Sequence, residues 1–369
     1  MKKILITGSD GFIAKNLILH LREMADIHLY LFSKNDSLNL LKTYILEADF
    51  IFHLAGINRP KNVDEFYSGN TKLTAFITQT LLDAQKITPI LFTSSTQVEL
   101  DNDYGKSKKE AEDKLVEYAK LSSADIFIYR LTNVFGKFSK PNYNSVIASW
   151  CYNITRSSEI KVDDKDKVLH LLYIDDVINS FIKRLTSKHS GYYYYEVEPV
   201  YSYSLGEIQE MLYEFKKSRQ TLVIPEVGSG FKRALYATYL SFLPKDGFSY
   251  PLNGHVDKRG TFYEILKTKN SGQISLSTTA VGISRGGHYH HTKNEKFLVV
   301  KGKALIKLRD VFSDEVIEYE VSSDKIEVVE MIPGYTHTLQ NTGDEELVLL
   351  MWANENFDQH NSDTYALEV

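Results

Sequence analysis

The chain has 369 residues, of which 43% are hydrophobic and 25% charged, and its formal net charge is −5. These values are typical of soluble globular proteins, and the lack of a basic surplus argues against a nucleic-acid partner. No apolar stretch approaches the roughly 18 residues of a membrane-spanning helix, so no membrane association is expected. The length favours two domains, while the single cysteine, Cys151, excludes an internal disulfide framework and favours a reducing, cytoplasmic setting.

The beginning of the chain predicts a dinucleotide site. An apolar strand at residues 3–7 leads into a Gly-x-x-Gly turn and then into an amphipathic helical pattern. Glycines let the backbone approach a pyrophosphate, and the helix N-terminus favours its negative charge. The turn alone is a weak signal, because such turns also join strands to helices without a ligand. The predicted cofactor-binding residues here are Gly8, Asp10, Gly11, Phe12 and Ile13.

The segments that follow strengthen this prediction. Four more apolar strands are predicted, with helical patterns between them, at residues 27–32, 50–54, 90–93 and 126–130. Strands that alternate with helices predict an α/β Rossmann fold, which is a doubly wound parallel sheet with helices on both faces.

The end of the second predicted strand bears on the choice of cofactor. An acidic residue at this place would bind the ribose 2′-hydroxyl of NAD. Here the strand is followed by Ser33 and Lys34, and the first carboxylate is Asp36. A hydroxyl and a cation suit a 2′-phosphate, so Ser33 and Lys34 favour NADPH. The alternative is that Lys34 is a solvated loop lysine, since exposed lysines are common.

A Tyr-x-x-x-Lys pair follows the fourth predicted strand, which ends at Ser94 and Ser95. Tyr104 and Lys108 are four residues apart and therefore share one face of a helix. A cation beside a phenol lowers the pKa of the phenol, so Tyr104 is expected to exchange a proton with an alcohol or ketone oxygen. Lys108 could also hold the nicotinamide ribose.

Residues 1–243 resemble the extended short-chain dehydrogenase/reductases that act on nucleotide-sugars. The matching pieces are Thr7-Gly8-x-x-Gly11-Phe-Ile-Ala14, His53-Leu-Ala-Gly56, Asn70-Thr-Lys-Leu-Thr, Tyr104-x-x-x-Lys108, Arg130-Leu-Thr-Asn133-Val-Phe-Gly136 and Tyr173-Ile-Asp-Asp176-Val. The resemblance implies catalytic Ser95, Tyr104 and Lys108, cofactor-binding Leu54, Ala55, Gly56, Tyr104 and Lys108, and substrate-binding Asn133. Two departures are Ala14 in place of the third glycine and a short connection between Ser95 and Tyr104, which leaves the substrate's pose open.

The second half of the chain has a different character. Turn residues at 244–251 mark a boundary, which we place so that the domains are residues 1–245 and 246–369. Short, alternating, turn-bounded segments then follow at residues 274–279, 297–300, 304–308, 316–321, 326–329 and 347–352. This pattern predicts an antiparallel β-barrel or sandwich.

A potential metal-ligand set lies in this half. His288 and His290 are two residues apart, so in a strand they point to the same face. Glu295 lies beyond a turn, and His337 comes from a later hairpin. Imidazole and carboxylate ligands suit Zn, Fe, Mn, Co or Ni. The alternative is that these are polar side chains on the surface of a strand and bind no metal.

The spacing of these residues resembles the two motifs of the cupin β-barrels. The first motif extends from Gly282 to Gly302 and the second from Pro333 to Asn341, with Glu327 where a glycine is usual. The resemblance implies an all-β cupin barrel that binds a divalent metal, with zinc the preferred candidate. The implied ligands are His288, His290, Glu295 and His337.

A further resemblance is to the cupin sugar epimerases that act on nucleotide-linked 4-keto-6-deoxy sugars. It is carried by Val256-Asp257-Lys-Arg259-Gly-Thr-Phe262-Tyr-Glu264 and by Arg285-Gly-Gly-His288. It implies that Arg259, Glu264 and Arg285 belong to the substrate site and that His288 is the catalytic base. Since Glu295 occupies the place of that family's catalytic lysine, His288 has two candidate roles, ligand or base, of which we favour base.

The pairing of such a reductase with such a cupin resembles the bifunctional enzymes of bacterial capsular polysaccharide synthesis. The resemblance implies a UDP-sugar substrate whose C3 is epimerised and whose C4 ketone is reduced by NADPH, giving UDP-N-acetyl-6-deoxy-L-talosamine on the route to UDP-N-acetyl-L-fucosamine. It also implies a homodimer formed through the cupin domain. The alternatives are a reductase whose cupin is a dimerisation module or a 3,4-ketoisomerase, and a non-catalytic NADPH-sensing protein.

Overall fold

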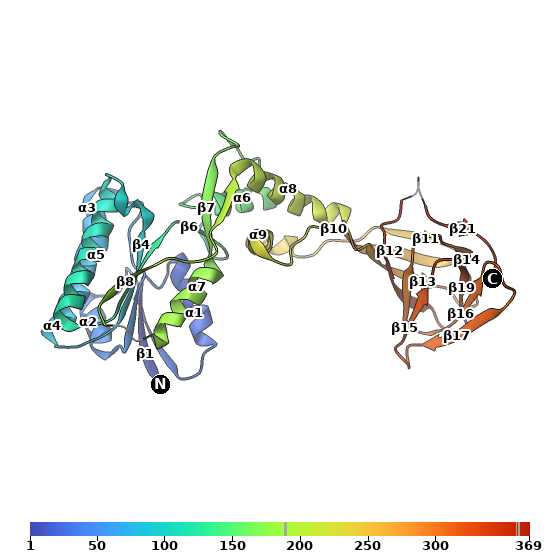
Figure 1. The fold of residues 1–369 in the computed structure, drawn as a ribbon, viewed down its shortest axis with the longest axis horizontal. Coiled ribbons are helices and arrows are strands. Elements are labelled where there is room, and N and C mark those ends of the chain that lie inside the picture. The colour runs from blue at the N-terminus through green and yellow to red at the C-terminus, as the bar shows by residue number, and fades with distance from the viewer. Residues whose placement is uncertain (188–189, 359, 361) are drawn as a thin grey trace. The chain divides into compact units, whose positions relative to one another are not determined.

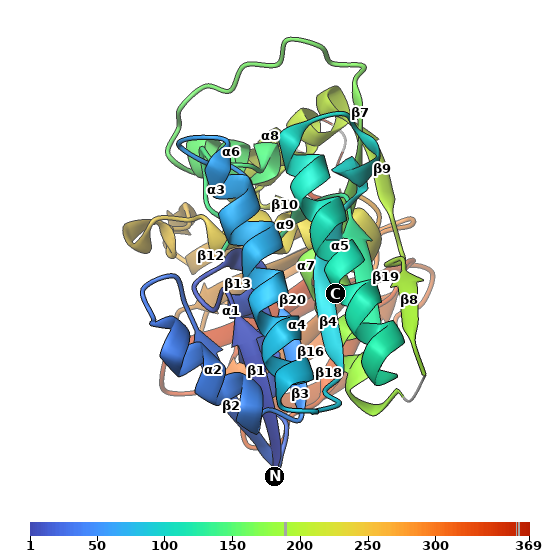
Figure 2. The same ribbon diagram turned by 90° about the vertical axis from the view of Figure 1, so that its left-hand side faces the viewer.

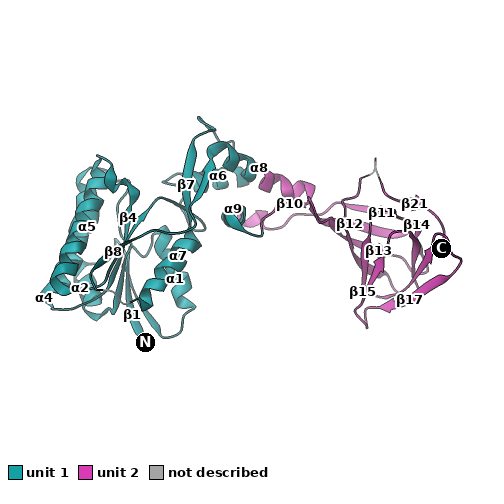
Figure 3. Ribbon diagram, in the orientation of Figure 1, with its two compact units in different colours: residues 1–212, 228–243 teal, residues 213–227, 244–369 magenta. Residues whose placement is uncertain are grey.

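The computed structural model describes residues 1–187, 190–358, 360 and 362–369, and it divides into two compact units (Figures 1 and 3). Unit 1 comprises Met1–Leu212 and Gly228–Leu243, and unit 2 comprises Tyr213–Val227 and Pro244–Val369. The segment before Val227 belongs to unit 2 because its short strand β10 (Val223–Ile224) pairs in parallel with β12 (Gly260–Thr268).

Unit 1 is built on a sheet of six parallel strands in the order β2-β1-β3-β4-β5-β8. The strands are β1 (Lys2–Thr7), β2 (Ile27–Phe32), β3 (Phe50–His53), β4 (Ile90–Ser95), β5 (Ile126–Leu131) and β8 (Tyr192–Tyr195). The order reverses at β1, because β2 and β3 pair with its opposite edges. The carboxyl ends of the strands at such a reversal form the crevice in which open α/β sheets bind ligands.

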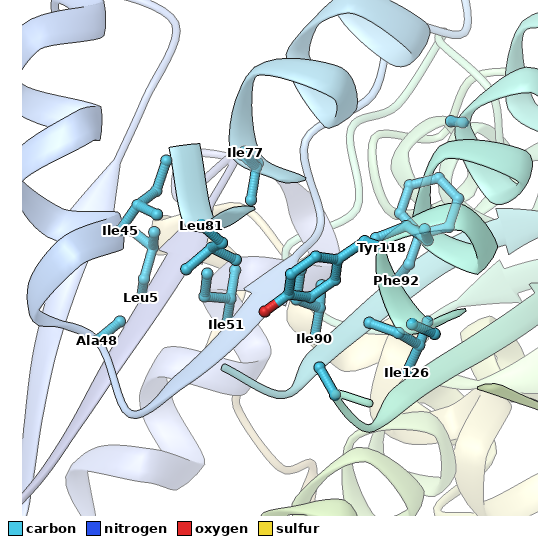
Figure 4. Close-up of a cluster of buried hydrophobic side chains, with 14 of the residues drawn as sticks. Leu5, Ile45, Ala48, Ile51, Ile77, Leu81, Ile90, Phe92, Tyr118 and Ile126 are labelled. Carbon is cyan, nitrogen blue, oxygen red and sulfur yellow. The ribbon is translucent and has the colours of Figure 1, made fainter. Parts of the chain in front are cut away.

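Helices cover both faces of this sheet (Figures 1 and 2). They are α1 (Phe12–Arg22), α2 (Leu38–Glu47), α4 (Leu73–Asp83), α5 (Asp103–Ser122) and α7 (Ile174–Ile182). Helices α2, α4 and α5 bury their apolar faces in one cluster against the sheet, with Ile45, Leu81 and Tyr118 among its members (Figure 4). The predicted α/β Rossmann fold is confirmed.

The rest of unit 1 consists of short elements and a second sheet. They are α3 (Asp64–Phe66), the π-helix η1 (Tyr67–Lys72), η2 (Thr96–Glu99), β6 (Asn133–Phe135), α6 (Val146–Thr155), β7 (Val168–Tyr173), η3 (Lys183–Thr186), β9 (Tyr201–Ser204), α9 (Gly230–Ser241) and the first part of α8 (Leu205–Thr221), which continues into unit 2 from Tyr213. Strands β6, β7 and β9 form the small sheet. Across the described residues, no helix is long and apolar enough to cross a membrane.

Unit 2 is almost entirely β and contains two sheets. Its elements are β10, η4 (Lys245–Gly247), β11 (Gly254–Asp257), β12, β13 (Gln273–Thr279), β14 (Ser284–Tyr289), β15 (Glu295–Lys301), β16 (Lys303–Asp310), β17 (Val316–Ser322), β18 (Val328–Met331), β19 (Tyr335–Asn341), β20 (Leu347–Ala353) and β21 (Tyr365–Ala366). One sheet has the order β10-β12-β13-β20-β15-β18 with β11 beside β12, and the other has the order β17-β16-β19-β14-β21. The predicted all-β second part of the chain is confirmed.

The interior of unit 2 is apolar in one region and polar in another. A hydrophobic cluster is formed by Phe297, Val299, Ala304, Ile306, Leu308, Val321, Val329, Met331, Leu339, Leu347 and Leu349. In β13 the alternation is inverted, since Ser275, Ser277 and Thr279 are buried while Ile274 and Leu276 are half-buried. Buried hydroxyls of this kind suit a polar ligand better than a sealed hydrophobic core.

Candidate active sites

The glycine turn after β1 fits a dinucleotide. Gly8 has a φ of +69°, and a Cβ added there would lie 2.8 Å from the Cα of Ala55, so the close approach of the two loops requires glycine. Gly11 is the N-cap of α1 and has no side-chain cap, which leaves amides of the first helical turn available to an anion. Asp10 is exposed beside them, and Phe12 and Ile13 begin the helix.

A buried histidine fixes the neighbouring loop. The Nδ1 of His53 lies 2.8 Å from the hydroxyl of Thr7, and its Nε2 lies 2.8 Å from the hydroxyl of Thr74. The hydroxyl of Thr7 also accepts a hydrogen bond from the amide of Ala55. This chain of contacts holds residues 54–56 at the carboxyl ends of β1 and β3, where the sequence predicts cofactor binding.

The end of β2 shows a feature that the sequence did not reveal. Lys34 is exposed, which agrees both with a role at a 2′-phosphate and with a solvated loop lysine. The carboxylate of Asp36 folds back to accept a hydrogen bond from the amide of Ser33 at 2.7 Å. An acidic group therefore stands beside the two residues predicted to hold a 2′-phosphate.

Ser95, Tyr104 and Lys108 lie together at the carboxyl end of β4. Tyr104 lies close enough to Ser95 for the serine side chain to affect the pKa of the phenol. The buried Nζ of Lys108 donates to the carbonyl oxygen of Thr93 at 2.9 Å. A Cβ added at Gly56 would lie 2.9 Å from this Nζ, so the loop after β3 reaches the lysine.

The electrostatics of this cluster correct one expectation. Burial raises the pKa of Tyr104, although the neighbouring Ser95 side chain partly offsets the rise. The expectation of a lowered pKa for Tyr104 is wrong, because desolvation of the phenol dominates. Burial lowers the pKa of Lys108 to about 8, against the opposing influence of the Glu112 carboxylate. A phenol that keeps its proton is suited to donate it.

The short connection between Ser95 and Tyr104 is packed into a defined shape. The hydroxyl of Ser95 accepts from the amide of Gln97 and caps η2, and the side chain of Asn102 caps α5 through the amide of Gly105. A Cβ added at Gly105 would lie 2.2 Å from the carbonyl oxygen of Gln97, so glycine is required for this contact. The turn therefore delivers Tyr104 to Ser95 without a longer loop.

Asn70 joins this cluster, although the sequence marked it merely as part of a resemblance. It lies in the π-helix η1, an element that is frequent at functional sites. Its amide contacts the backbone of Ile57 through both of its polar atoms and donates to the hydroxyl of Ser107 at 2.9 Å. The predicted substrate residue Asn133 lies instead in the small sheet, where it is exposed and donates to the carbonyl of His170 at 3.4 Å.

In unit 2, four side chains converge as a potential metal site. One ligand atom from each of His288, His290, Glu295 and His337 lies within 4.8 Å of the others. Strand β14 ends at Tyr289 and β15 begins at Glu295, and β19 pairs His337 opposite His288 across a bulge. The three elements thus bring together residues that are up to 49 positions apart in the chain.

The donor set fits a divalent cation. The Nε2 of His290 and the Nδ1 of His337 are buried without a hydrogen-bond partner among the described residues. Such atoms are costly unless a ligand satisfies them. Burial and the nearby His290 lower the pKa of His288, and burial and His288 lower that of His337 to about 4, so both rings are neutral near neutral pH. Neutral imidazole is the form that binds a metal.

Glu295 is also prepared for this role. Burial would raise its pKa, but the neighbouring His290 and the charge of Lys293 lower it to about 2. The Oε2 atom lies 3.5 Å from the Nε2 of His290 and 3.6 Å from that of His337. The Oε1 atom accepts instead from the ammonium of Lys293 at 3.0 Å. One carboxylate oxygen therefore faces the histidines while the other is held by the lysine.

The three predicted substrate residues of unit 2 have local partners. Arg259 is mostly exposed and pairs with Asp257. Arg285 donates to the carbonyl of Thr278 at 2.9 Å, and it is close enough to Arg259 for that charge to contribute to the lowering of its pKa, after burial. Glu264 forms an ion pair with Lys267 at 2.8 Å.

The fold and these sites define a class of protein. A parallel sheet with a glycine turn and a Ser–Tyr–Lys cluster is joined in one chain to a β domain with a His–Glu cluster. The chain belongs to the NAD dependent epimerase/dehydratase family, which residues 4–195 match. Residues 255–365 match the polysaccharide biosynthesis C-terminal domain.

Particular relatives span the whole chain. It is 47% identical over 367 residues to the UDP-2-acetamido-2,6-beta-L-arabino-hexul-4-ose reductase of Pseudomonas aeruginosa, covering 100% of this chain and 99% of that protein. The crystal structure of the capsular polysaccharide assembling protein CapF from Staphylococcus aureus is similar at 45% identity, with a TM-score of 0.93 over 99% of this chain and 100% of CapF. The resemblance to enzymes of capsular polysaccharide synthesis is confirmed.

A more distant structure shows the fold of unit 1 alone. The UDP-glucuronic acid 4-epimerase of Bacillus cereus in complex with NAD is 18% identical, with a TM-score of 0.55 over 65% of this chain and 98% of that protein.

Proposed function

We propose that the chain is a bifunctional nucleotide-sugar enzyme, with a reductase in residues 1–245 and a sugar 3-epimerase in residues 246–369. The substrate would be a UDP-4-keto-6-deoxy-N-acetylhexosamine and the product UDP-N-acetyl-6-deoxy-L-talosamine, on the route to UDP-N-acetyl-L-fucosamine for capsular polysaccharide. The Ser95–Tyr104–Lys108 cluster carries the proposal, because it stands in a chain similar over its full length to a named UDP-sugar 4-keto reductase.

In the reductase site the protein would supply binding, orientation and a proton. NADPH held at the glycine turn would supply the hydride for the carbonyl carbon at C4. Tyr104 gives its hydroxyl proton to the carbonyl oxygen, and Ser95 holds that oxygen in place. Lys108 orients the ribose and keeps positive charge beside the developing alkoxide. Gly8, Asp10, Gly11, Phe12, Ile13 and residues 54–56 would hold the dinucleotide, with Ser33 and Lys34 at its 2′-phosphate.

In the cupin site the side chains would move a proton at C3. A hydrogen beside a ketone is acidic, and a bound divalent metal such as zinc would polarise that ketone further. His290 and His337 are buried while His288 is partly exposed, so His288 is the histidine best placed to meet a substrate as base. It removes the C3 proton, and a proton returns to the opposite face. Arg259, Glu264 and Arg285 are the substrate residues proposed for this site, and Asn133 is the one proposed for the reductase site. His288 as fourth metal ligand is the competing role.

The proposal includes a homodimer formed through the cupin domain. Large apolar side chains exposed on unit 2 support it, among them Phe312, Ile317 and Tyr319. The partners are otherwise the UDP-sugar alone, with neither nucleic acid nor membrane, in the cytoplasm. The competing functions are a cupin that serves for dimerisation or 3,4-ketoisomerisation, and an NADPH sensor without catalysis.

The two activities should separate by mutation. Tyr104→Phe removes the proton donor and should lower NADPH oxidation by at least about a hundredfold, while solvent deuterium still enters C3 of the keto sugar. His337→Ala removes a buried ligand and should abolish the exchange while leaving the reduction of an already epimerised substrate.

Product NMR in deuterated buffer and absorbance of the nicotinamide report the two steps, and NADH in parallel tests the cofactor preference. Loss of deuterium exchange in Tyr104→Phe would show that the steps are not divided between the two sites. Formation of a 3-keto product would instead support the isomerase.

A further inference from the structure

The last described segment of the chain, Asp363–Val369, lies against the His–Glu cluster of unit 2. Its strand β21 pairs antiparallel with β14, so that Ala366 stands opposite His288 and Tyr365 opposite Tyr289. The amide of Leu367 donates to the carbonyl of Gly287. The segment therefore forms an edge strand beside the strand that carries the first histidine.

The same segment contacts the second histidine directly. The Nδ1 of His290 lies 2.5 Å from the carbonyl oxygen of Asp363, which is an acceptor, so Nδ1 carries the proton. The lone pair is then on Nε2, which is the atom that faces Glu295 and has no partner among the described residues. This backbone oxygen thus fixes both the tautomer and the orientation of the ring, as outer partners of metal-binding histidines do.

The side chain of Asp363 ties down the turn that leads to Glu295. Its carboxylate accepts from the backbone amides of His291, Thr292 and Lys293 at 2.7–3.0 Å, and also from the hydroxyl of Thr292. Lys293 in turn holds the Oε1 of Glu295. Lys293 therefore links the two carboxylates, since its amide contacts Asp363 and its ammonium contacts Glu295.

The segment also contacts β19, the strand that carries the third histidine, His337. The hydroxyl of Thr336, which precedes His337, donates to the carbonyl of Leu367, and Arg309 donates to the carbonyl of Glu368 at 2.6 Å. The four ligands lie on β14, in the turn after it, on β15 and on β19. Asp363–Val369 contacts β14, the turn and β19 directly, and it is linked to Glu295 on β15 through Lys293.

We propose that Asp363, with the strand that follows it, is a positioning residue for the His–Glu cluster: it sets the tautomer of His290 and the turn that presents Glu295. This inference rests on the proposed metal site and adds a residue that no family motif quoted above contains. A metal would then bind to a preformed set of donors, and loosening the segment would cost metal affinity before it cost the fold.

The test compares variants of the full-length protein. Asp363→Ala removes all four hydrogen bonds of the carboxylate. Asp363→Asn keeps one acceptor oxygen, so it should fall between Asp363→Ala and the wild type. Asp358→Ala is the matched control, because Asp358 lies in the same terminal region and accepts a backbone amide, that of His360.

The measurements are the affinity for Zn²⁺, by competition with a chromogenic chelator, and the visible absorption spectrum of the Co²⁺ form, which reports ligand geometry. We expect Asp363→Ala to bind Zn²⁺ roughly 10- to 100-fold more weakly and to alter the Co²⁺ spectrum, as loss of an outer partner does. Asp358→Ala should match the wild type in both. Circular dichroism melting in EDTA gives the stability of the metal-free fold.

Wild-type affinity and spectrum in a folded Asp363→Ala protein would overturn the positioning role while leaving the metal site intact. If Asp363→Ala does not fold, Asp363→Asn becomes the test variant. Wild-type Zn²⁺ affinity and a wild-type Co²⁺ spectrum in Asp363→Asn would then overturn the positioning role. Failure of the wild-type protein to bind Zn²⁺ or Co²⁺ would overturn the metal site and this inference together.

Discussion

At the scale of single residues, unit 1 contains a buried histidine, His53, whose protonation state depends on the fold. His53 is fully buried between two threonine hydroxyls, and burial together with the charge of Lys108 lowers its pKa to about 3. The ring is therefore neutral in the folded protein at any pH near neutrality. Its two nitrogens use one donor and one acceptor, which is what the neutral form provides.

Acid should therefore weaken unit 1 through His53. The unfolded chain binds a proton at this histidine below pH 6.5, whereas the folded chain does so only near pH 3, so the free energy of unfolding falls as the pH decreases between these values. At a pH of about 5 the loss should be about 2 kcal/mol. Urea unfolding at two pH values, with His53→Gln as the variant that cannot titrate, measures the difference. Equal pH dependence in both proteins would contradict it.

At the scale of elements, turns and caps decide where the reactive side chains point. A capping box begins α8, since Ser204 and Glu207 each accept from the other's amide. That interaction is local, so the sequence reveals it. The start of α5 depends instead on the close approach of Gly105 to the carbonyl of Gln97, which lies in the preceding element η2.

Gly105→Ala should therefore impair the reductase although alanine favours helices. The added methyl group would strike the carbonyl of Gln97, so the first turn of α5 must move and carry Tyr104 away from Ser95. A displacement of about 1 Å can cost about a hundredfold in rate. Steady-state NADPH oxidation measures it, with Lys106→Ala as the control, since Lys106 forms merely an exposed ion pair in the same turn. Unchanged activity in Gly105→Ala would mean that the turn adapts.

At the scale of the whole molecule, the His–Glu cluster that we propose as a metal site belongs to one of two compact units. Its members lie on β14, on β15, on β19 and in the turn after β14, and all of these elements are in unit 2. A ligand that binds the folded form stabilises the unit that contains its site.

Removal of the metal should therefore shift one unfolding transition and leave the other in place. At a free metal concentration of about one hundred times the dissociation constant, the metal stabilises its unit by about 2.7 kcal/mol. Differential scanning calorimetry with and without EDTA should show the transition of unit 2 at a lower temperature in EDTA. The transition of unit 1, identified by its response to NADPH, should not move. A shift of both transitions by the same amount would indicate that the units unfold together.

The sequence by itself determined the elements and supplied most of the candidate site residues. Strand and helix periods are local, so the parallel sheet and the β domain were predictable, as was the capping box at Ser204. The spacing of His288, His290 and Glu295 is also local. Together with His337 from a later hairpin, these residues were predicted as one set, and the structure brings their ligand atoms together.

The tertiary structure alone decided which distant groups meet. The contact of Asp363 with His290 joins residues 73 positions apart, and no local pattern marks that aspartate. The raised pKa of Tyr104 and the lowered pKa of Lys108 result from burial, which depends on the packed environment and not on their spacing in the helix. Hydrogen bonding and desolvation act over a few ångströms in space, so the final protonation and orientation of these side chains become defined when the chain is folded.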